Sequence, residues 1–239
     1  MGFEQKTGFM KRIYSNSRIA WILQSVTFLA LIAICLFLTS GRLDWLMAWI
    51  YFGVSIVFAI FSGLVMHHNH PDLMAERSTI KKDIKKWDRL LLGILSRGPL
   101  IVPAVAGLDM RYVWTPANSY ELQISALIIG VAGHALSLWA LSSNKFFSAV
   151  VRIQTDRGHS VASEGPYLFI RHPGYLGMIL LLASAPVMLD SSWAFIPATI
   201  TIAAIIVRTS LEDATLQKEL DGYASYTQQV RYLLLPRIW

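Results

Sequence analysis

Residues 45–66 read WLMAWIYFGVSIVFAIFSGLVM and contain no charged side chain. A helix needs about 20 mostly apolar residues to cross a hydrocarbon core of about 30 Å. The stretch therefore predicts a transmembrane helix, and it places the chain among all-α integral membrane proteins.

Three further segments extend this pattern on either side. Ile19–Thr39 is equally free of charge, and Leu122–Ser143 is interrupted only by His134. Leu90–Leu108 is a weaker candidate, because it contains Arg97 and two prolines. Together with residues 45–66, these segments predict four transmembrane helices in the first part of the chain.

The apolar run from Pro173 to Val207 is broken only by Asp190 near its middle. It predicts two short helices joined by a turn over residues 189–192, which brings the expected number of spans to six. Hydrophobic residues make up 54% of the chain and the mean hydropathy is +0.48, above the values of an ordinary soluble domain. The chain is expected to be a single membrane domain, with an N-terminal region over residues 1–142 and a C-terminal region over residues 143–239.

The net charge of +6 is distributed unevenly. Eighteen of the 21 Lys and Arg residues lie in segments that a six-span topology places on one side, and only Arg42 and Arg111 lie on the other. This distribution obeys the positive-inside rule and predicts that both termini are cytoplasmic. It argues against a nucleic-acid partner. The single cysteine, Cys35, excludes an intramolecular disulfide and a cysteine metal cluster, and the oligomeric state stays open.

Two polar features allow a plain structural interpretation. HHNHPD at residues 67–72 brings three histidines and an aspartate together, but no second cluster completes a metal shell, so no metal is predicted. The connection from Met66 to Leu90 is expected to be an interfacial loop whose lysines meet anionic lipid head groups. Within the spans, Arg97 can pair or reach the interface, and His134 can hydrogen-bond a neighbouring helix.

The segment from Asn144 to His172 is polar and punctuated by glycine, although apolar runs flank it. Such irregular backbone is tolerated near a bilayer only where protein buries it or water reaches it. Beyond the next apolar run, Arg208 and Glu212 are spaced i, i+4 and share a helix face. They are expected either to form a surface ion pair or to line a site together with Arg171 and His172 at the cytoplasmic boundary.

The sequence motifs GPYLFIRHPGYLG (165–177), RTSLED (208–213) and GYASYTQQVRYLLLP (222–236) occur in this order around the predicted hairpin. This combination resembles the isoprenylcysteine carboxyl methyltransferase family, which is related to the membrane phospholipid methyltransferases. The resemblance covers roughly Asn144–Pro236. It implies that S-adenosylmethionine binds in a cytoplasmic pocket capped by the C-terminal helical segment.

The resemblance also implies roles for individual residues. Arg208 would bind the methyl acceptor, and Arg208 and Glu212 would form the catalytic pair. The family often has two glutamates where this chain has Glu212-Asp213, and Gln154 aligns only after a small length adjustment. The implied cofactor contacts are Gln154, His159, Ser160, Val161, Ala162, Tyr167, His172, Pro173, Gly174, Tyr175 and Glu212.

Methyl transfer from a sulfonium needs alignment and exclusion of water rather than a metal. A carboxylate acceptor needs a cation to hold it, and Arg208 favours this acceptor over a phospholipid amine or a thiol. The substrate is expected to be lipophilic or lipidated and to enter from the bilayer. An NADPH-dependent membrane reductase of the sterol type and a non-enzymatic scaffold are the alternatives from other classes.

Overall fold

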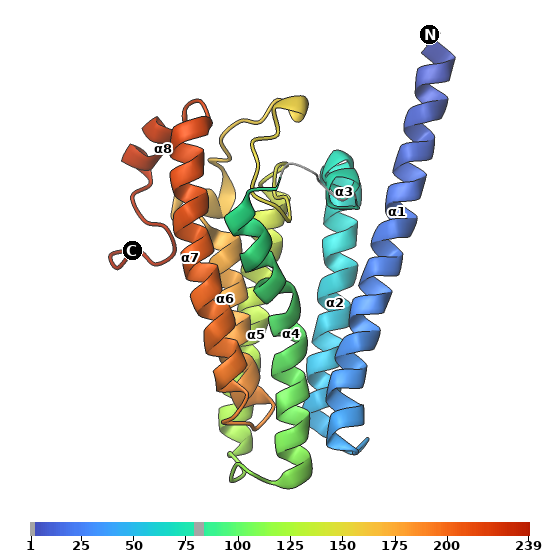
Figure 1. Cartoon of the computed structure of the whole chain (residues 1–239), viewed down its shortest axis with the longest axis vertical. Helices are drawn as coiled ribbons and strands as arrows, with labels where there is room; N and C mark the ends of the chain where they lie inside the picture. The colour runs from blue at the N-terminus through green and yellow to red at the C-terminus, as the bar shows by residue number, and fades with distance from the viewer. Residues whose placement is uncertain (1–2, 79–83) are drawn as a thin grey trace.

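The computed structural model describes residues 3–78 and 84–239, with side chains described from Ser17 onward. Within these ranges the regular secondary structure is entirely helical (Figure 1). The long elements are α1 (Phe3–Ala33), which continues into the π-helical segment η1 (Ile34–Leu38), α2 (Leu46–Asn69), α4 (Lys86–Tyr112), α5 (Tyr120–Ser142), α6 (Pro173–Met188) and α7 (Phe195–Glu219). The short elements are α3 (Pro71–Ser78), η2 (Thr155–Arg157), η3 (Gly165–Leu168) and α8 (Tyr223–Gln229).

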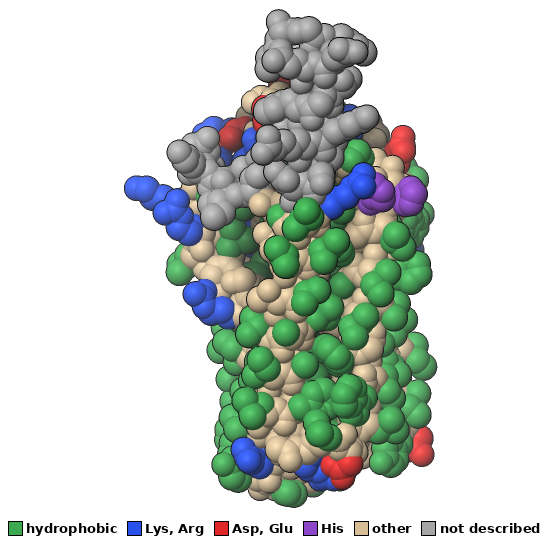
Figure 2. All heavy atoms as spheres, turned by 90° about the vertical axis from the view of Figure 1, so that its right-hand side faces the viewer, with side chains coloured by type: hydrophobic (Ala, Val, Ile, Leu, Met, Phe, Trp, Pro, Cys, Tyr) green, Lys and Arg blue, Asp and Glu red, His purple; other side chains and the backbone are tan. Residues whose placement is uncertain are grey.

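Five helices of the described part are long and apolar enough to cross a membrane: Ser17–Leu38, Leu46–Asn69, Lys86–Tyr112, Tyr120–Ser142 and Phe195–Glu219. Figure 2 shows the face formed by α1 and α2, where most of the side chains are hydrophobic and most of the charged side chains and the histidines lie toward the two ends. The chain is thus an integral multi-pass membrane protein. The four predicted N-terminal spans coincide with α1–η1, α2, α4 and α5, and α4 runs unbroken through Pro99 and Pro103.

The pair α6 and α7 differs from the two short helices expected after residue 172. Helix α6 has 16 residues, which is about 24 Å and less than the hydrocarbon core. Helix α7 has 25 residues and continues well past Val207, so the prediction of a short second helix is wrong. The charged residues that were expected to follow the helix lie inside it, because Arg208 and Asp213 are buried in ion pairs. The two helices join at Asp190, whose φ of 59° reverses the chain.

The connection between α2 and α4 is also more regular than the loop that was expected. Its first part continues α2 to Asn69, and α3 follows after His70. Pro71 begins α3, a position where its missing N–H costs no hydrogen bond. Lys81 and Lys82, two of the lysines expected to meet lipid head groups, lie outside the described residues.

Helices α5 and α6 pack closely through small residues. A Cβ atom added at Gly133 would lie 2.6 Å from the carbonyl oxygen of Gly177, and one at Gly177 would lie 2.5 Å from that of Gly133. No side chain fits at such distances, so the two backbones can approach only because both positions are glycine.

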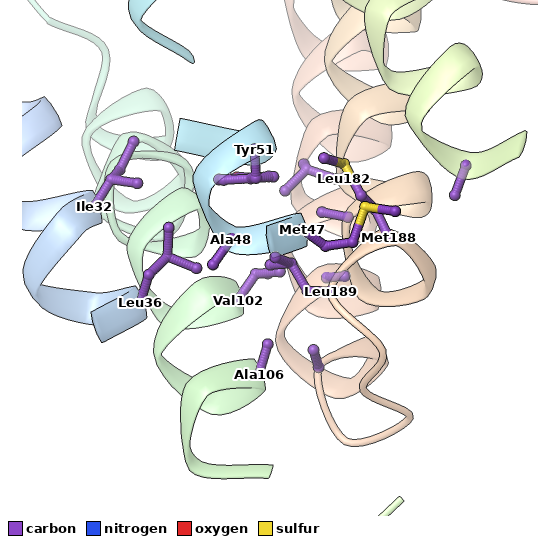
Figure 3. Close-up of a cluster of buried hydrophobic side chains, with 14 of the residues drawn as sticks. Ile32, Leu36, Met47, Ala48, Tyr51, Val102, Ala106, Leu182, Met188 and Leu189 are labelled. Carbon is purple, nitrogen blue, oxygen red and sulfur yellow. The ribbon is translucent and has the colours of Figure 1, made fainter. Parts of the chain in front are cut away.

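A buried apolar cluster joins the helices at the end of the bundle opposite to α3 and α8 (Figure 3). Its members come from α1, η1, α2, α4, α5, α6, α7 and the turn after α6, and include Ile32, Leu36, Met47, Ala48, Tyr51, Val102, Ala106, Leu182, Met188 and Leu189. The other end of the bundle holds the polar segment between α5 and α6, where α1 begins and α7 ends (Figure 1). The apolar cluster and the polar segment thus lie at opposite ends of the bundle.

Candidate functional site

A cavity of about 360 Å³ lies at the polar end of the bundle. Its walls come from the end of α3, from the segment between α5 and α6, from the first turns of α4 and α6, from the last turns of α7 and from α8. Residues far apart in the sequence therefore meet around one space.

Every residue that was predicted to contact the cofactor lines this cavity except Pro173. Pro173 instead forms the first residue of α6. Arg208, the predicted substrate contact, also lines the cavity. The lining residues among the predicted set are Gln154, His159, Ser160, Val161, Ala162, Tyr167, His172, Gly174, Tyr175, Arg208 and Glu212.

The loop that carries Gln154 is stabilised by its own polar contacts. Gln154 is 1% exposed, and its side-chain amide donates to the carbonyl of Phe146 at 2.9 Å. Its backbone N–H donates to Nδ1 of His159 at 3.2 Å, and the imidazole of His159 lies 4.4 Å from the ring of Phe146. Burial and the nearby charges of Arg157 and Arg152 lower the pKa of His159 to about 4. The neutral imidazole can therefore accept this hydrogen bond at neutral pH.

The next residues of the loop offer backbone groups to the cavity. Ser160, Val161 and Ala162 have no regular secondary structure, and within residues 3–78 and 84–239 their N–H groups donate to no backbone carbonyl. Unpaired N–H groups at a cavity are ready donors for the oxygens of a polar ligand.

The Arg-His-Pro stretch before α6 connects three parts of the chain. Arg171 donates through Nε and Nη2 to both carboxylate oxygens of Asp213, at 2.8 and 3.1 Å. Its Nη1 donates to the carbonyls of Val230 and Arg231, and its backbone N–H donates to the carbonyl of Tyr232. Arg171 thereby holds both α7 and the C-terminal segment at the start of α6.

Asp213 has further partners that complete this buried network. The hydroxyl of Tyr223 donates to Asp213 at 2.8 Å, and Nε2 of His172 lies 3.3 Å from the same oxygen. The prediction that Arg171 and His172 meet the residues around Glu212 is thus confirmed in position, but their partner is the neighbouring Asp213.

Arg208 and Glu212 do not pair with each other, so the surface ion pair considered for them is wrong. Arg208 donates through Nε to Asp88 at 2.7 Å and through Nη2 to the carbonyl of Ala149 at 2.8 Å. Asp88 is fully buried and also accepts from the backbone N–H of Val151 at 2.7 Å. The ion pair of Arg208 and Asp88 therefore joins α7, α4 and the loop. It forms in place of a local i, i+4 pair between Arg208 and Glu212, because both buried charges exchange water for several hydrogen bonds.

Glu212 accepts a hydrogen bond of 2.5 Å from the hydroxyl of Tyr175. The ring of Tyr175 lies 5.5 Å from the guanidinium carbon of Arg208, a cation–π distance. Tyr175 thus separates the carboxylate from the guanidinium, and each faces the cavity with a different chemistry.

Two tyrosines close the cavity on the side of α8. The hydroxyl of Tyr226 donates to the carbonyl of Tyr167 at 2.6 Å, and the side chain of Asn144 donates to the hydroxyl of Tyr167 at 3.2 Å. Burial raises the pKa of Tyr167 and of Tyr226, so both remain neutral donors.

Sequence reasoning missed several residues of this site: Arg77, Asp88, Asn144, Asp213, Tyr223 and Tyr226. Asp88 sits in a charge-rich run that was taken as an interfacial loop. The one signal in the sequence was that this run and the segment around Arg208 both place charged residues beside apolar segments. This signal does not show which residues pair with each other.

The histidines set aside in the sequence lie outside this cavity. The rings of His67 and His68 are 5.2 Å apart, and Nε2 of His70 lies 2.9 Å from the carbonyl of Ser142. In the described part of the chain, no three His, Cys, Asp or Glu side chains form a possible metal site. His134 stacks on Phe58 of the neighbouring helix at 4.2 Å, instead of making the predicted hydrogen bond.

Comparison with known proteins points to the same part of the chain. The sequence model of the isoprenylcysteine carboxyl methyltransferase (ICMT) family matches residues 126–218. Proteins of Oryza sativa subsp. indica and subsp. japonica, each described as "Probable protein-S-isoprenylcysteine O-methyltransferase", are 23% identical to the chain over 107 residues. This is 44% of the chain and 56% of each relative, so the chain matches about half the length of these relatives.

The matched segment starts within α5 and ends in the last turn of α7. It contains the whole polar loop, Arg208 and Glu212, but stops before the tyrosines of α8. The resemblance inferred from the sequence motifs is therefore confirmed, and residues 126–218 carry the sequence pattern of the ICMT family.

Proposed function

We propose that the protein is an S-adenosylmethionine-dependent methyltransferase that acts on the carboxylate of a lipophilic acceptor of the isoprenylcysteine type. One observation carries the proposal: the residues that the family resemblance implies as cofactor contacts surround a single cavity. On this proposal residues 143–239 form the cofactor-binding and catalytic region, and the distribution of Lys and Arg supports a cytoplasmic position of the cavity.

The cavity suits a zwitterionic nucleoside in size and in chemistry. Its volume of about 360 Å³ lies within the range of roughly 300–1,000 Å³ typical of small-molecule sites. Glu212 has one described partner, the hydroxyl of Tyr175, and its second oxygen is available to a cationic group. The backbone N–H groups of residues 160–162 are available to a carboxylate or a ribose hydroxyl.

When bound, S-adenosylmethionine supplies an electrophilic methyl group on a sulfonium, and displacement by a carboxylate oxygen yields an ester and a neutral thioether with no proton to remove. Charge disappears in this step, so a cavity shielded from water favours it. The ion pairs of Arg171 and Arg208 fix the loop, α4 and α7 around the cavity, which keeps the reacting groups aligned.

The apolar part of the wall supports a lipophilic acceptor. Leu92 and Leu95 of α4 and Met178 of α6 line the cavity beside the buried pair of Arg208 and Asp88. A substrate with a hydrocarbon chain would bury it against these side chains, at about 0.8 kcal/mol per CH₂ group.

Two measurements on the purified full chain in detergent test the proposal. Titration calorimetry should show micromolar binding of S-adenosylhomocysteine, about 8 kcal/mol, and no binding of NADPH at the same concentration. N-acetyl-S-farnesylcysteine should then receive a labelled methyl group that mild alkali releases as methanol, which is a property of esters and not of methylated amines or thiols. Absence of S-adenosylhomocysteine binding by protein with an intact thermal transition would refute the proposal.

A further inference from the structure

Arg77 lines the same cavity but belongs to none of the motifs discussed so far. It lies in the last turn of α3, outside the segment that matches the family. Its side chain is half-buried, and its guanidinium carbon lies 5.8 Å from the centroid of the Phe147 ring. The structure therefore brings an additional cation to the wall of the candidate site.

Among the described residues, Arg77 differs from the other arginines of this wall because no carboxylate pairs with it. Arg152 pairs with Glu76 at 2.8 Å, Arg171 with Asp213 at 2.8 Å, and Arg208 with Asp88 at 2.7 Å. Across residues 3–78 and 84–239, no carboxylate lies within 4.0 Å of the Arg77 guanidinium.

The surroundings of Arg77 make a positive charge without a carboxylate partner among the described residues unfavourable. Burial and the positive charge of Arg208 lower the pKa of Arg77. A partly desolvated cation close to another positive charge gains free energy when an anion binds to it. The wall is thus built to receive a negative charge at this point.

The other polar groups of the wall indicate which anion this is. Glu212 and the loop of residues 160–162 offer the partners that a cofactor needs, and Tyr175 separates Glu212 from Arg208. Arg208 cannot offer its Nε edge to a ligand, because Asp88 occupies it. Within the described ranges, its Nη1 donates to no protein atom and remains available to a ligand in the cavity that Arg77 also lines.

We propose that Arg77 binds the carboxylate of the methyl acceptor, with Nη1 of Arg208 as a secondary contact. This inference rests on the proposed function. It assigns the main contact with the acceptor carboxylate to Arg77 instead of Arg208. The shared chemistry is a carboxylate, which both the acceptor and the cofactor possess, so the experiment must distinguish these two sources.

The test compares the affinities of purified full-length variants for N-acetyl-S-farnesylcysteine and for its uncharged carboxamide, with S-adenosylhomocysteine present. Wild-type protein should prefer the carboxylate roughly tenfold to a hundredfold, the range of a charge-assisted hydrogen bond. Arg77→Met keeps the apolar stem and should reduce this preference to about twofold or less. Arg77→Lys should restore only part of it, because an ammonium lacks the planar fork of a guanidinium.

Two controls separate this role from general effects of charge or folding. Arg97→Met removes an exposed arginine whose Nη1 donates to the carbonyl of Gly93, and the preference should stay at the wild-type value. The affinity of Arg77→Met for S-adenosylhomocysteine should change less than about twofold, with an unchanged thermal transition. If Arg77→Met does not fold, the test relies on Arg77→Lys, for which we expect a severalfold smaller preference for the carboxylate over the carboxamide than in wild-type protein.

Each contrary outcome has a definite meaning. Loss of S-adenosylhomocysteine affinity with a retained preference would assign Arg77 to the carboxylate of the cofactor and overturn the inference. An unchanged preference in both Arg77 variants would overturn it as well. If wild-type protein binds S-adenosylhomocysteine but does not distinguish carboxylate from carboxamide, the inference fails alone, whereas absence of S-adenosylhomocysteine binding removes the proposed function itself.

Discussion

Replacing the adjacent carboxylates Glu212 and Asp213 by their amides should produce two different defects. The two residues are neighbours in α7, but their surroundings differ. Asp213 is buried and holds Arg171 through two hydrogen bonds, together with Tyr223. Glu212 is half-buried, lines the cavity and accepts a hydrogen bond from Tyr175. We expect Asp213→Asn to affect stability and Glu212→Gln to affect cofactor binding.

The magnitude for Asp213→Asn follows from its pairing with Arg171. Their side chains are 5% and 7% exposed, and removal of one partner of a buried ion pair costs about 3–5 kcal/mol. A chain of this size loses roughly 2–4 °C in melting temperature per kcal/mol, so we expect a decrease of roughly 6–20 °C. The C-terminal segment should loosen as well, because Arg171 also holds the carbonyl of Val230.

Glu212→Gln leaves an oxygen acceptor for the hydroxyl of Tyr175, so we expect its melting temperature to fall by at most a few degrees. The lost charge should weaken binding of S-adenosylhomocysteine roughly tenfold to a hundredfold, equivalent to about 1.5–3 kcal/mol. Differential scanning fluorimetry and titration calorimetry of both variants in the same detergent provide the two readouts. Equal losses of melting temperature in the two variants, or loss of ligand binding by Asp213→Asn at an unchanged melting temperature, would refute this division of roles.

Two further predictions concern the pH dependence of stability and the orientation of the chain. The folded-state pKa of His159, about 4, lies below its ordinary value of 6.5, so the unfolded chain takes up the proton first as the pH falls. The contribution of His159 to stability is present above pH 6.5 and declines between pH 6.5 and 4. The melting temperature of wild-type protein should therefore fall more steeply in this window than that of His159→Asn, and equal slopes would contradict the assignment. In a Cys35→Ala background, a membrane-impermeant maleimide should label Ser225→Cys only from the cytoplasmic side and Ser192→Cys only from the opposite side. Labelling of both from one side would contradict a membrane crossing by α7.

The sequence predicted those parts of the fold that depend on local pattern. Long uncharged runs such as residues 45–66 specify a span by themselves, and Pro173 and Asp190 mark the start of α6 and the turn that follows it. The candidate wall residues from Gln154 to Tyr175 could be predicted because they are close together in the sequence and carry a family motif.

The features that escaped prediction depend on pairing between distant residues. Arg208 was expected to lie beyond the apolar helix, because a lone charge ends a hydrophobic run. Its partner Asp88 is separated from it by 120 positions, and no local pattern connects the two. The role of Arg77 likewise becomes visible only once the other arginines of the wall have been matched to their carboxylates.

The contact between Gly133 and Gly177 sets the distance between α5 and α6, and this distance influences the width of the cavity although neither glycine lines it. The polar loop leaves the end of α5 and returns to the start of α6, so the separation of these two helices sets the span across which the loop is stretched. An added methyl group at either glycine would meet a backbone oxygen at about 2.5 Å and would force the helices apart. A larger residue on this helix interface can therefore widen the cavity, while every residue that lines the cavity stays the same.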